Sequence, residues 1–437
     1  MSSSRKRYAI VGLGSRSSMF WKALTGPYKE SAELVGLCDV NQTRMAYVNR
    51  TLLDEGKLTK PVPTYQAEAF DQMVKETRPD VIIVTTIDRL HHRYIIRAAE
   101  LGCDAISEKP MTTDAEKCQQ ILDTLARTGR KLRVTFNYRY SPARWKVREL
   151  IRDGVIGDVK QVHFEWLLDT RHGADYFRRW HRDKSNSGGL MVHKSTHHFD
   201  LVNWWLGARP EVVFGFGSLA FYGRENAEAR GVHAPYYRTT GAPGGEKDPF
   251  ALDLRKVPQM KALYLDAEHE DGYLRDRNVF SDGISIEDTM NLLVRYDTGA
   301  QMSYSLAAYC PWEGYRVMFT GTKGRIELQD VERPYVSGDG TESGESLQKG
   351  KNIIVYPHFA EAYCVTPAAA VGGHGGGDTP LLDSLFGPQE NAVEDPLGLA
   401  ANEVDGAWSI LTGIAANRSF ATGLPVFTRE LVRFPQQ

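Results

Sequence analysis

The segment "GGLMVHKSTHHFD", residues 188–200, carries four basic side chains within six positions. They are His193, Lys194, His197 and His198. An imidazole changes its charge near neutral pH, so it can move a proton to or from an alcohol, and histidine is also a frequent metal ligand. Three uses of the cluster follow: a metal site, an acid/base relay, or the polar face of a helix.

The spacing within the cluster bears on each of these uses. His193 and His197 are four residues apart and would share one face of a helix that ends at Gly207, a spacing that a zinc site could use. Lys194 stands where the zincin pattern has glutamate, and no nearby run of carboxylates or cysteines offers a third ligand. We therefore predict no metal. Both histidines lie off the apolar stripe of that helix, so a solvated polar face and proton chemistry stay open.

The first third of the chain contains the elements that would position these groups against a cofactor. The run "RYAIVGLGSRS" is a buried strand followed by Gly12, Gly14 and Ser17. This is the spacing of a dinucleotide-binding turn, with serine in place of the third glycine. The next apolar run ends in Asp39, about 20 residues beyond the glycines, where a carboxylate can hold ribose hydroxyls. Asp39 would repel a 2′-phosphate, so we predict NAD, although Arg44 could accept that phosphate.

Strands and helices alternate through residue 136. Apolar runs over 80–86, 103–110 and 131–136 read as strands, and residues 114–128 have a helical pattern. This alternation predicts a doubly wound parallel sheet. Ligands of such sheets bind beyond the carboxyl ends of the strands. Lys109 follows one of those ends, so its ammonium could hold a reacting oxygen and stabilise charge on it.

Composition excludes several classes of protein. The chain has 437 residues, 42% hydrophobic and 25% charged, which predicts an ordinary globular protein of two domains. A formal net charge of -2 gives no general attraction to nucleic acid or to an anionic membrane. No apolar segment is long enough to span a bilayer, and the five scattered cysteines argue against a disulfide framework. We expect a cytoplasmic enzyme.

The ordered motifs resemble the Gfo/Idh/MocA family, which includes glucose–fructose oxidoreductase and inositol dehydrogenase. The motifs that carry the resemblance are "GLGSRS", Asp39, "TTIDRLHH", "EKP", "NYRYSP", Trp180, "SGG" and His197. The family implies an α/β fold: an N-terminal NAD-binding Rossmann domain, residues 1–137, and a C-terminal α/β domain, residues 138–437, with a large open, mostly antiparallel sheet. It also implies an enzyme that acts on a small-molecule sugar and forms a homodimer or homotetramer. We expect a polar insertion at about 220–285.

The resemblance assigns roles to individual residues. Lys109 would lie beside the nicotinamide and the substrate hydroxyl, and His197 would be the catalytic base, which Asp200 could orient. His193 stands where the family usually has aspartate, so it would be a second acid/base group or a substrate contact. Tyr138 would line the pocket beside them. The expected cofactor contacts are Gly12, Gly14, Ser15, Arg16, Ser17, Asp39, Arg44, Thr86, His91, Glu108, Lys109, Trp180 and His181.

A basic stretch precedes the histidine cluster, in "DTRHGADYFRRWHRDKSNSGG", residues 169–189. Guanidinium groups bind oxyanions through several contacts at once, so the stretch indicates an anionic substrate. The alternative is a contact with the cofactor pyrophosphate together with solvated surface. Tyr309 could stack on a sugar or simply pack, and His374 lies in a glycine loop that could close over a substrate. The expected substrate contacts are Arg178, Arg179, Lys194, His172, Tyr309 and His374, with Arg139 also lining the pocket.

The added basic groups resemble the redox-neutral, NAD-dependent glycosidase branch of this superfamily. Oxidation of a pyranoside at C3 would acidify the proton at C2, so that a base could remove it and the group at C1 could be eliminated. Addition of water and reduction of the ketone would complete hydrolysis of the glycoside. An anionic sugar such as sulfoquinovose or a uronate would fit. The alternatives are a plain NAD-dependent sugar or polyol dehydrogenase and a non-catalytic NAD-binding sensor, which Lys109 and His197 argue against.

Overall fold

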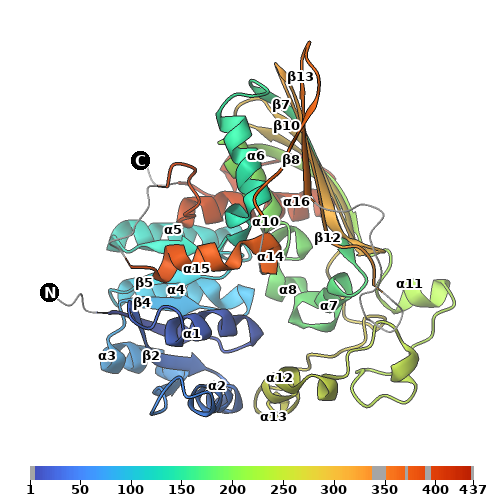
Figure 1. Ribbon diagram of the computed structural model, residues 1–437. Coiled ribbons are helices and arrows are strands. Elements are labelled where there is room, and N and C mark those ends of the chain that lie inside the picture. Colours follow the sequence, from blue (N-terminus) through green and yellow to red (C-terminus); the bar gives the residue numbers. More distant parts are fainter. Residues whose placement is uncertain (1–4, 337–350, 370–372, 389–394, 435–437) are drawn as a thin grey trace.

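The computed structural model describes residues 5–336, 351–369, 373–388 and 395–434, which fold around two sheets (Figure 1). The strands of the first sheet are β1 Lys6–Val11, β2 Ala32–Asp39, β3 Thr64–Gln66, β4 Val81–Val84, β5 Asp104–Ser107 and β6 Leu132–Val134. All described pairings in this sheet are parallel, in the order β3-β2-β1-β4-β5-β6. The helices that alternate with these strands are α1 Ser18–Thr25, α2 Gln42–Asp54, α3 Phe70–Thr77, α4 His91–Glu100 and α5 Ala115–Thr128.

The second sheet has nine described strands in the order β14-β13-β12-β11-β7-β10-β9-β8-β15. They are β7 Val159–Asp169, β8 Pro210–Ser218, β9 Thr289–Tyr296, β10 Gln301–Cys310, β11 Glu313–Gly321, β12 Gly324–Arg333, β13 Lys351–Pro357, β14 Tyr363–Val365 and β15 Val426–Phe427. Among them only the β7–β10 pair is parallel. The predicted fold class, a Rossmann sheet plus an α/β domain with a mostly antiparallel sheet, is confirmed.

Most of the remaining helices cover or connect the second sheet, whereas the helix that ends at Phe386 packs on the core of the first sheet. The remaining helices are α6 Pro142–Arg152, α7 His172–Arg178, α8 Lys184–Ser187, α9 Leu190–His193, α10 Thr196–Leu206, α11 Arg224–Ala229, α12 Pro258–Met260, α13 Glu268–Asp271, α14 Gly373–Gly376, α15 Asp378–Phe386 and α16 Glu403–Thr422. The predicted domain boundary at 137/138 lies between β6 and β7. In the described part of the chain, no helix combines the length and the apolar character needed to cross a membrane.

The turn after β1 depends on the glycine that the sequence pattern singled out. Gly12 has a φ of +88°, in the left-handed region that favours glycine. A Cβ atom at Gly12 would lie 2.6 Å from the backbone nitrogen of Thr86, which follows β4. No other residue fits this close approach of two chain segments. The turn therefore brings the carboxyl ends of β1 and β4 together, where a cofactor of a doubly wound sheet binds.

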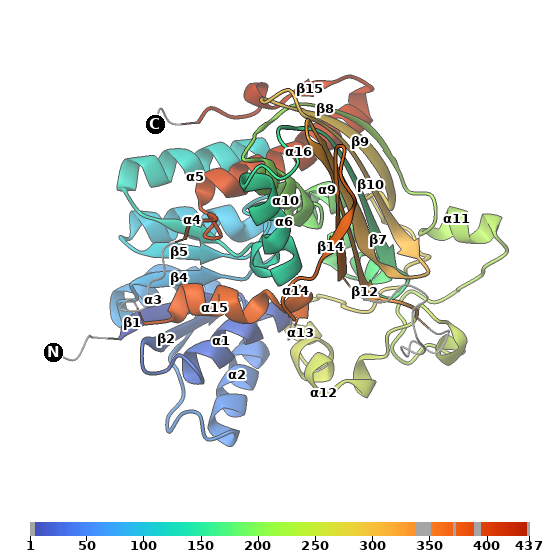
Figure 2. The ribbon, with the colours of Figure 1, turned by 45° about the horizontal axis from the view of Figure 1, so that its top comes forward.

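Helices α9, α10 and α16 lie between the two sheets (Figure 2). Val192 of α9 belongs to the apolar core of the first sheet, whereas its neighbour Met191 belongs to that of the second. Helix α16 divides in the same way, with Ile410 in the first core and Ala415 in the second. The histidine segment is therefore held at the junction of the two domains, facing the carboxyl ends of the parallel strands.

The interpretation of α10 as a helix with a solvated polar face is wrong. Every residue from Thr196 to Val202 is buried, because α16 and the second sheet cover the helix. His198 is completely buried and forms a hydrogen bond with the hydroxyl of Tyr304 at 2.7 Å. His193 and His197 also do not share one continuous helix, since α9 ends at His193 and α10 begins at Thr196.

A long excursion joins β8 to β9 over residues 219–288, where a polar insertion was expected. It runs out past α11 and then returns to the first domain, where the segment around α12 and α13 lies against α2 (Figure 1). Arg182 donates to the backbone carbonyls of Asn278, Asp282 and Gly283 at the returning end of the excursion. The insertion thus contacts both domains.

One buried ion pair fixes α10 against the end of the first domain. The guanidinium of Arg139 donates to both carboxylate oxygens of Asp200, at 2.8 and 2.6 Å, and lies 3.1 Å from the carboxylate of Asp405 on α16. The expectations that Asp200 orients His197 and that Arg139 lines the pocket are therefore wrong. Both groups are buried, so each needs the other to balance its charge.

We predict that Arg139→Met lowers the free energy of unfolding by about 3–5 kcal/mol, because it leaves Asp200 as an unpaired buried charge. Urea unfolding followed by circular dichroism measures this change. The control is Lys160→Gln, which removes an exposed ion pair with Asp158 and should leave the midpoint unchanged. Equal midpoints for the two variants would contradict the proposed role of the Arg139–Asp200 pair.

Candidate functional site

Three side chains from separate segments meet where the two domains join. The Nδ1 of His193 donates to the carboxylate of Asp88 at 2.5 Å. The ammonium of Lys109 lies 3.4 Å from the Nε2 of the same imidazole and donates to the His193 carbonyl at 3.2 Å. Asp88 follows β4 and Lys109 follows β5, so both stand at carboxyl ends of parallel strands. The structure therefore brings two predicted residues, Lys109 and His193, into contact through a carboxylate that the sequence reasoning missed.

Burial controls the charges of this group. It raises the pKa of Asp88 and lowers the pKa of His193, and the ammonium of Lys109 lowers the pKa of His193 further. Burial also lowers the pKa of Lys109 to about 8, against the opposing effect of Asp88 and Glu108. A neutral imidazole whose Nδ1 donates to Asp88 presents the lone pair of Nε2 toward Lys109. The lowered pKa keeps His193 neutral, so its Nε2 can accept a proton, while Lys109 changes its charge near pH 8.

His181 and Trp180 border this group. The two rings stack at 3.5 Å between centroids, and the His181 ring lies 4.1 Å from that of His193. Ligand atoms of Asp88, His181 and His193 all lie within 4.8 Å of one another, so the expectation that no third metal ligand is near His193 is wrong.

The charges around these ligand atoms oppose a divalent cation. The ammonium of Lys109 and the guanidinium of Arg179 act on the same groups, and each favours the ionised form of Asp88 while it lowers the pKa of His193. Both positive charges would repel a metal ion. The absence of a metal therefore stays a prediction.

A second group forms around Tyr138, in the turn after β6. The His197 ring stacks on the Tyr138 ring at 4.1 Å, and the ammonium of Lys194 donates to the Tyr138 hydroxyl at 3.1 Å. The His374 ring lies 5.9 Å from that of Tyr138, so this residue of the glycine loop lies beside the group, and its contact with a substrate stays a prediction. His374 is fixed there by Asp378 at 2.9 Å. Burial lowers the pKa of His197 and of Lys194, and it raises the pKa of the Tyr138 hydroxyl.

The predicted cofactor residues line the carboxyl edge of the first sheet. Asp39 ends β2, is buried, and accepts hydrogen bonds from the backbone of Leu13 and Asn41 at 2.5 and 2.9 Å. Burial raises the pKa of Asp39. The closely packed turn at Gly12 and a buried carboxylate at the end of β2 fit a dinucleotide, whose ribose hydroxyls can replace the backbone donors of Asp39.

The other cofactor candidates connect neighbouring strand ends. Arg16 donates to Glu108 at 2.6 Å, and the His91 ring lies 2.8 and 3.0 Å from the carbonyls of Pro110 and Thr86. His91 is buried, so its contacts hold the turn after β5 against the turn after β4. The remaining candidates of the glycine turn are Gly14, Ser15 and Ser17, and Ser17 donates to the Gly14 carbonyl at 2.8 Å.

Three predicted substrate contacts have internal partners instead. Arg178 is buried and donates to the carbonyl of Phe250 at 3.0 Å, within the insertion. The Tyr309 ring stacks on Phe221 at 4.6 Å, which is the packing alternative for this residue. His172 pairs with the carboxylate of Glu313 at 2.6 Å. Part of the basic stretch therefore anchors the insertion. The sequence did not indicate this role, because the partners of these guanidinium groups are backbone carbonyls, which every residue carries.

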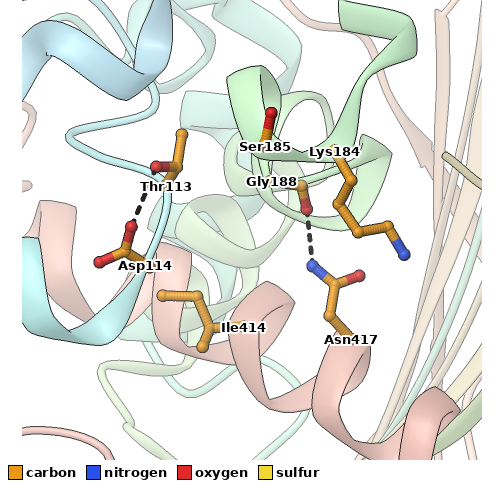
Figure 3. Close-up of a pocket in the computed structure, with 7 residues that line it drawn as sticks. All are labelled: Thr113, Asp114, Lys184, Ser185, Gly188, Ile414 and Asn417. Carbon is orange, nitrogen blue, oxygen red and sulfur yellow. Dashed lines mark hydrogen bonds between the residues drawn. The ribbon is translucent and has the colours of Figure 1, made fainter. Parts of the chain in front are cut away.

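A pocket of about 340 Å³ lies beside α8 and α16 and contains none of the predicted site residues (Figure 3). It is lined by Thr113, Asp114, Lys184, Ser185, Gly188, Ile414 and Asn417. The Asn417 side chain donates to the carbonyl of Gly188 at 2.6 Å. This contact fixes the "SGG" turn directly before α9. The pocket thus lies beside a contact that holds the histidine segment in place, away from the candidate site residues.

The chain matches two family descriptions over most of its length. Residues 6–136 match "Oxidoreductase family, NAD-binding Rossmann fold", and residues 148–426 match "Oxidoreductase family, C-terminal alpha/beta domain". "Putative oxidoreductase YteT" of Bacillus subtilis (strain 168) is 37% identical over 98% of both chains. A "Glycosyl hydrolase family 109 protein" of Shewanella sp. (strain W3-18-1) is 23% identical over 97% of this chain and 85% of that protein. The WlbA dehydrogenase of Bordetella pertussis, solved with NADH and UDP-GlcNAcA, shares the fold with a TM-score of 0.63, at 18% identity over 97% and 98% of the chains.

We predict that Lys109 reacts with an amine-acylating reagent with a half-maximal rate near pH 8, since burial lowers its pKa to about 8. Labelling is measured by mass spectrometry, and exposed Lys160 in the same digest serves as the reference for the extent of reaction. Asp88→Asn should move the Lys109 midpoint to lower pH, because the Asp88 charge raises that pKa. An unchanged midpoint in Asp88→Asn would show that the charge of Asp88 does not act on Lys109.

Proposed function

The chain belongs to the Gfo/Idh/MocA family of NAD-binding oxidoreductases, and from this premise we propose that it oxidises a sugar ring hydroxyl, at C3, in the course of hydrolysing a glycoside. The observation that carries the proposal is the contact of Lys109 with His193, whose imidazole is oriented by Asp88. An alcohol loses its hydroxyl proton as hydride leaves its carbon, and this pair supplies the proton acceptor. A dinucleotide held at the turn of Gly12 and by Asp39 would supply the acceptor for the C3 hydride and the donor that restores it.

The middle of the cycle needs acid/base groups at C2 and C1. We assign removal of the C2 proton to the second group, His197 and Tyr138, whose rings stack 4.1 Å apart. The electron pair of the broken C2–H bond forms a C1–C2 double bond as the C1–O bond breaks, and the leaving oxygen takes a proton. Water then adds across the double bond, returning hydrogen to C2 and hydroxyl to C1. The sum is glycoside plus water giving sugar plus alcohol, with the cofactor unchanged.

Two features favour hydrolysis over net oxidation. His193 replaces the aspartate that is usual in the family, and the site holds a second set of basic groups with Lys194 and His197. The Shewanella relative named as a glycosyl hydrolase aligns with 97% of this chain. A plain sugar or polyol dehydrogenase is the second candidate, favoured by the name of the Bacillus relative. The contact of Lys109 with an oriented His193 argues against a non-catalytic sensor.

We propose an anionic sugar on the basis of Lys194. Its ammonium is buried, and among the described residues its hydrogen bond is to the neutral hydroxyl of Tyr138. Against the effect of burial, His172 and Lys194 lower the pKa of Glu313 to about 2. Glu313 and Glu332 both act on Lys194, but Glu313 already has His172 at 2.6 Å and Glu332 has Arg144 at 2.8 Å. A carboxylate or sulfonate of the substrate could supply the missing charge.

Assembly into a homodimer or homotetramer stays a proposal. The outer face of the second sheet exposes Phe216 and Leu293, 66% and 61% accessible, on the neighbouring strands β8 and β9. A groove on this face also contains Phe214 and Met318. Large exposed apolar groups of this kind mark contact surfaces between proteins. A second copy of the chain is the partner that the family resemblance implies.

A panel of nitrophenyl glycosides in heavy water distinguishes the two candidate functions. We expect phenol release without accumulation of NADH, and deuterium at C2 of the released sugar, because C2 loses and regains hydrogen during each turnover. The C3 hydrogen should be retained, since it returns from the cofactor. Accumulation of NADH would show a dehydrogenase, and a sugar without deuterium at C2 would exclude elimination.

The same assay tests the catalytic groups. Lys109→Ala and His193→Ala should each lower turnover by about 10²–10⁴, the usual contribution of a positioned acid or base. Both variants should keep their affinity for NAD. The matched control is His358→Gln, an exposed histidine that follows β13, and its turnover should be unchanged. Normal turnover in either site variant would refute its assignment.

Lys194→Met tests the charge of the sugar. We expect KM to rise by about tenfold or more for a carboxylated or sulfonated sugar, since a charge-assisted hydrogen bond is worth roughly 1.5–3 kcal/mol. The neutral analogue should lose much less. Arg178→Met is the comparison, because its guanidinium is held by the insertion and should not distinguish the two sugars. Equal effects of Lys194→Met on both sugars would remove the argument for an anionic substrate.

A further inference from the structure

The returning part of the insertion, residues 258–273, packs on the edge of the first domain where the adenosine half of a dinucleotide binds in this fold. The hydroxyl of Tyr264 accepts a hydrogen bond from the backbone nitrogen of Ser15 at 2.9 Å and lies 2.8 Å from its Oγ. The same hydroxyl would be 3.5 Å from a Cβ atom at Gly14. The insertion therefore reaches the glycine turn itself, from more than 200 residues further along the chain.

Two carboxylates of α13 pair with the backbone amides and the arginine at the start of α2. Glu270 accepts hydrogen bonds from the backbone nitrogens of Gln42 and Thr43, at 2.5 and 2.9 Å. Asp271 forms an ion pair with Arg44 at 2.6 Å. A helix N-terminus and an adjacent arginine are the groups that would bind a 2′-phosphate after β2. Here both are already paired with carboxylates from the insertion.

Arg44 is held in place on several sides. Its Nε donates to the carbonyl of Leu263 at 3.0 Å, and its guanidinium is 3.8 Å from Asp39 as well as 2.6 Å from Asp271. The residue is 7% exposed, and its Nη2 has no hydrogen-bond partner among the described residues. The single positive charge faces two carboxylates, so a phosphate would add further repulsion.

We propose that Asp271 and Glu270 are specificity-determining residues of the cofactor site, which select NAD over NADP by withholding Arg44 and the first amides of α2 from a 2′-phosphate. Asp39, at the end of β2, repels the phosphate from the other side. The selection thus depends on an insertion that belongs to the second domain. This inference concerns the dinucleotide alone and does not depend on the sugar or on the hydrolytic reaction.

The test measures dissociation constants of NAD and NADP by isothermal titration calorimetry on the full chain after bound nucleotide is removed. We expect Asp271→Asn to tighten NADP binding by roughly tenfold, equivalent to 1.4 kcal/mol, and to change NAD binding by less than about threefold. The double variant with Glu270→Gln should tighten NADP binding further. Asp266→Asn is the matched control, because Asp266 pairs only locally with exposed Lys261 at 2.7 Å in the described structure.

A second variant shows whether a gain in NADP affinity comes from the freed Arg44 or only from a loosened insertion. Adding Arg44→Met to Asp271→Asn should abolish the gain in NADP affinity, because the released guanidinium is the group that binds the phosphate. Unchanged NADP affinity in Asp271→Asn would overturn the proposal. So would an equal gain with and without Arg44, or a loss of NAD affinity larger than the gain for NADP, since either result would assign Asp271 a general role in holding the insertion.

Discussion

The hydrogen bond between Asp88 and His193 is the contact on which the site depends, because it joins the two domains at the point of chemistry. It requires α9 to lie between the cores of both sheets, which Val192 and Met191 achieve by packing in opposite directions. It also sets the tautomer of the imidazole, so that Nε2 faces Lys109. A shift of either domain would separate His193 from Asp88 and Lys109 at the ends of the parallel strands.

Burial has two opposite consequences around this contact. At Arg139 and Asp200, opposite charges face each other directly, and the pair fixes α10. At Lys109 and His193, burial lowers the pKa of both basic groups, and the Lys109 ammonium lowers the pKa of His193 further. Paired opposite charges hold a helix in place, whereas burial of basic groups favours their neutral forms. Both pairs belong to the same junction.

The insertion between β8 and β9 connects the two halves of the site. At one end it is held by the basic stretch, where Arg178 and Arg182 donate to its backbone carbonyls. At the other end it reaches the glycine turn through Tyr264 and meets Arg44 through Asp271. One segment therefore contacts both the dinucleotide-binding turn and the stretch that precedes the histidine cluster. Two of the arginines that precede the histidine cluster, Arg178 and Arg182, thus have a structural role.

The sequence by itself determined the features that are local in the chain. The Rossmann strands, the turn at Gly12 and the acid at Asp39 follow from apolar runs and spacing, because neighbouring residues fix strand, turn and strand end. The partners of buried polar groups could not be predicted, since they come from distant segments. Asp88 lies in the motif "TTIDRLHH", just beyond a strand. Because ligands bind beyond the carboxyl ends of parallel strands, this position could have marked Asp88 as a candidate site residue. Its pairing with His193 could not be predicted, since it forms only when the two domains pack together. Only the tertiary structure decided which basic residues titrate in the site and which, such as Arg178, hold an insertion, because a side chain's charge is set by what is buried beside it.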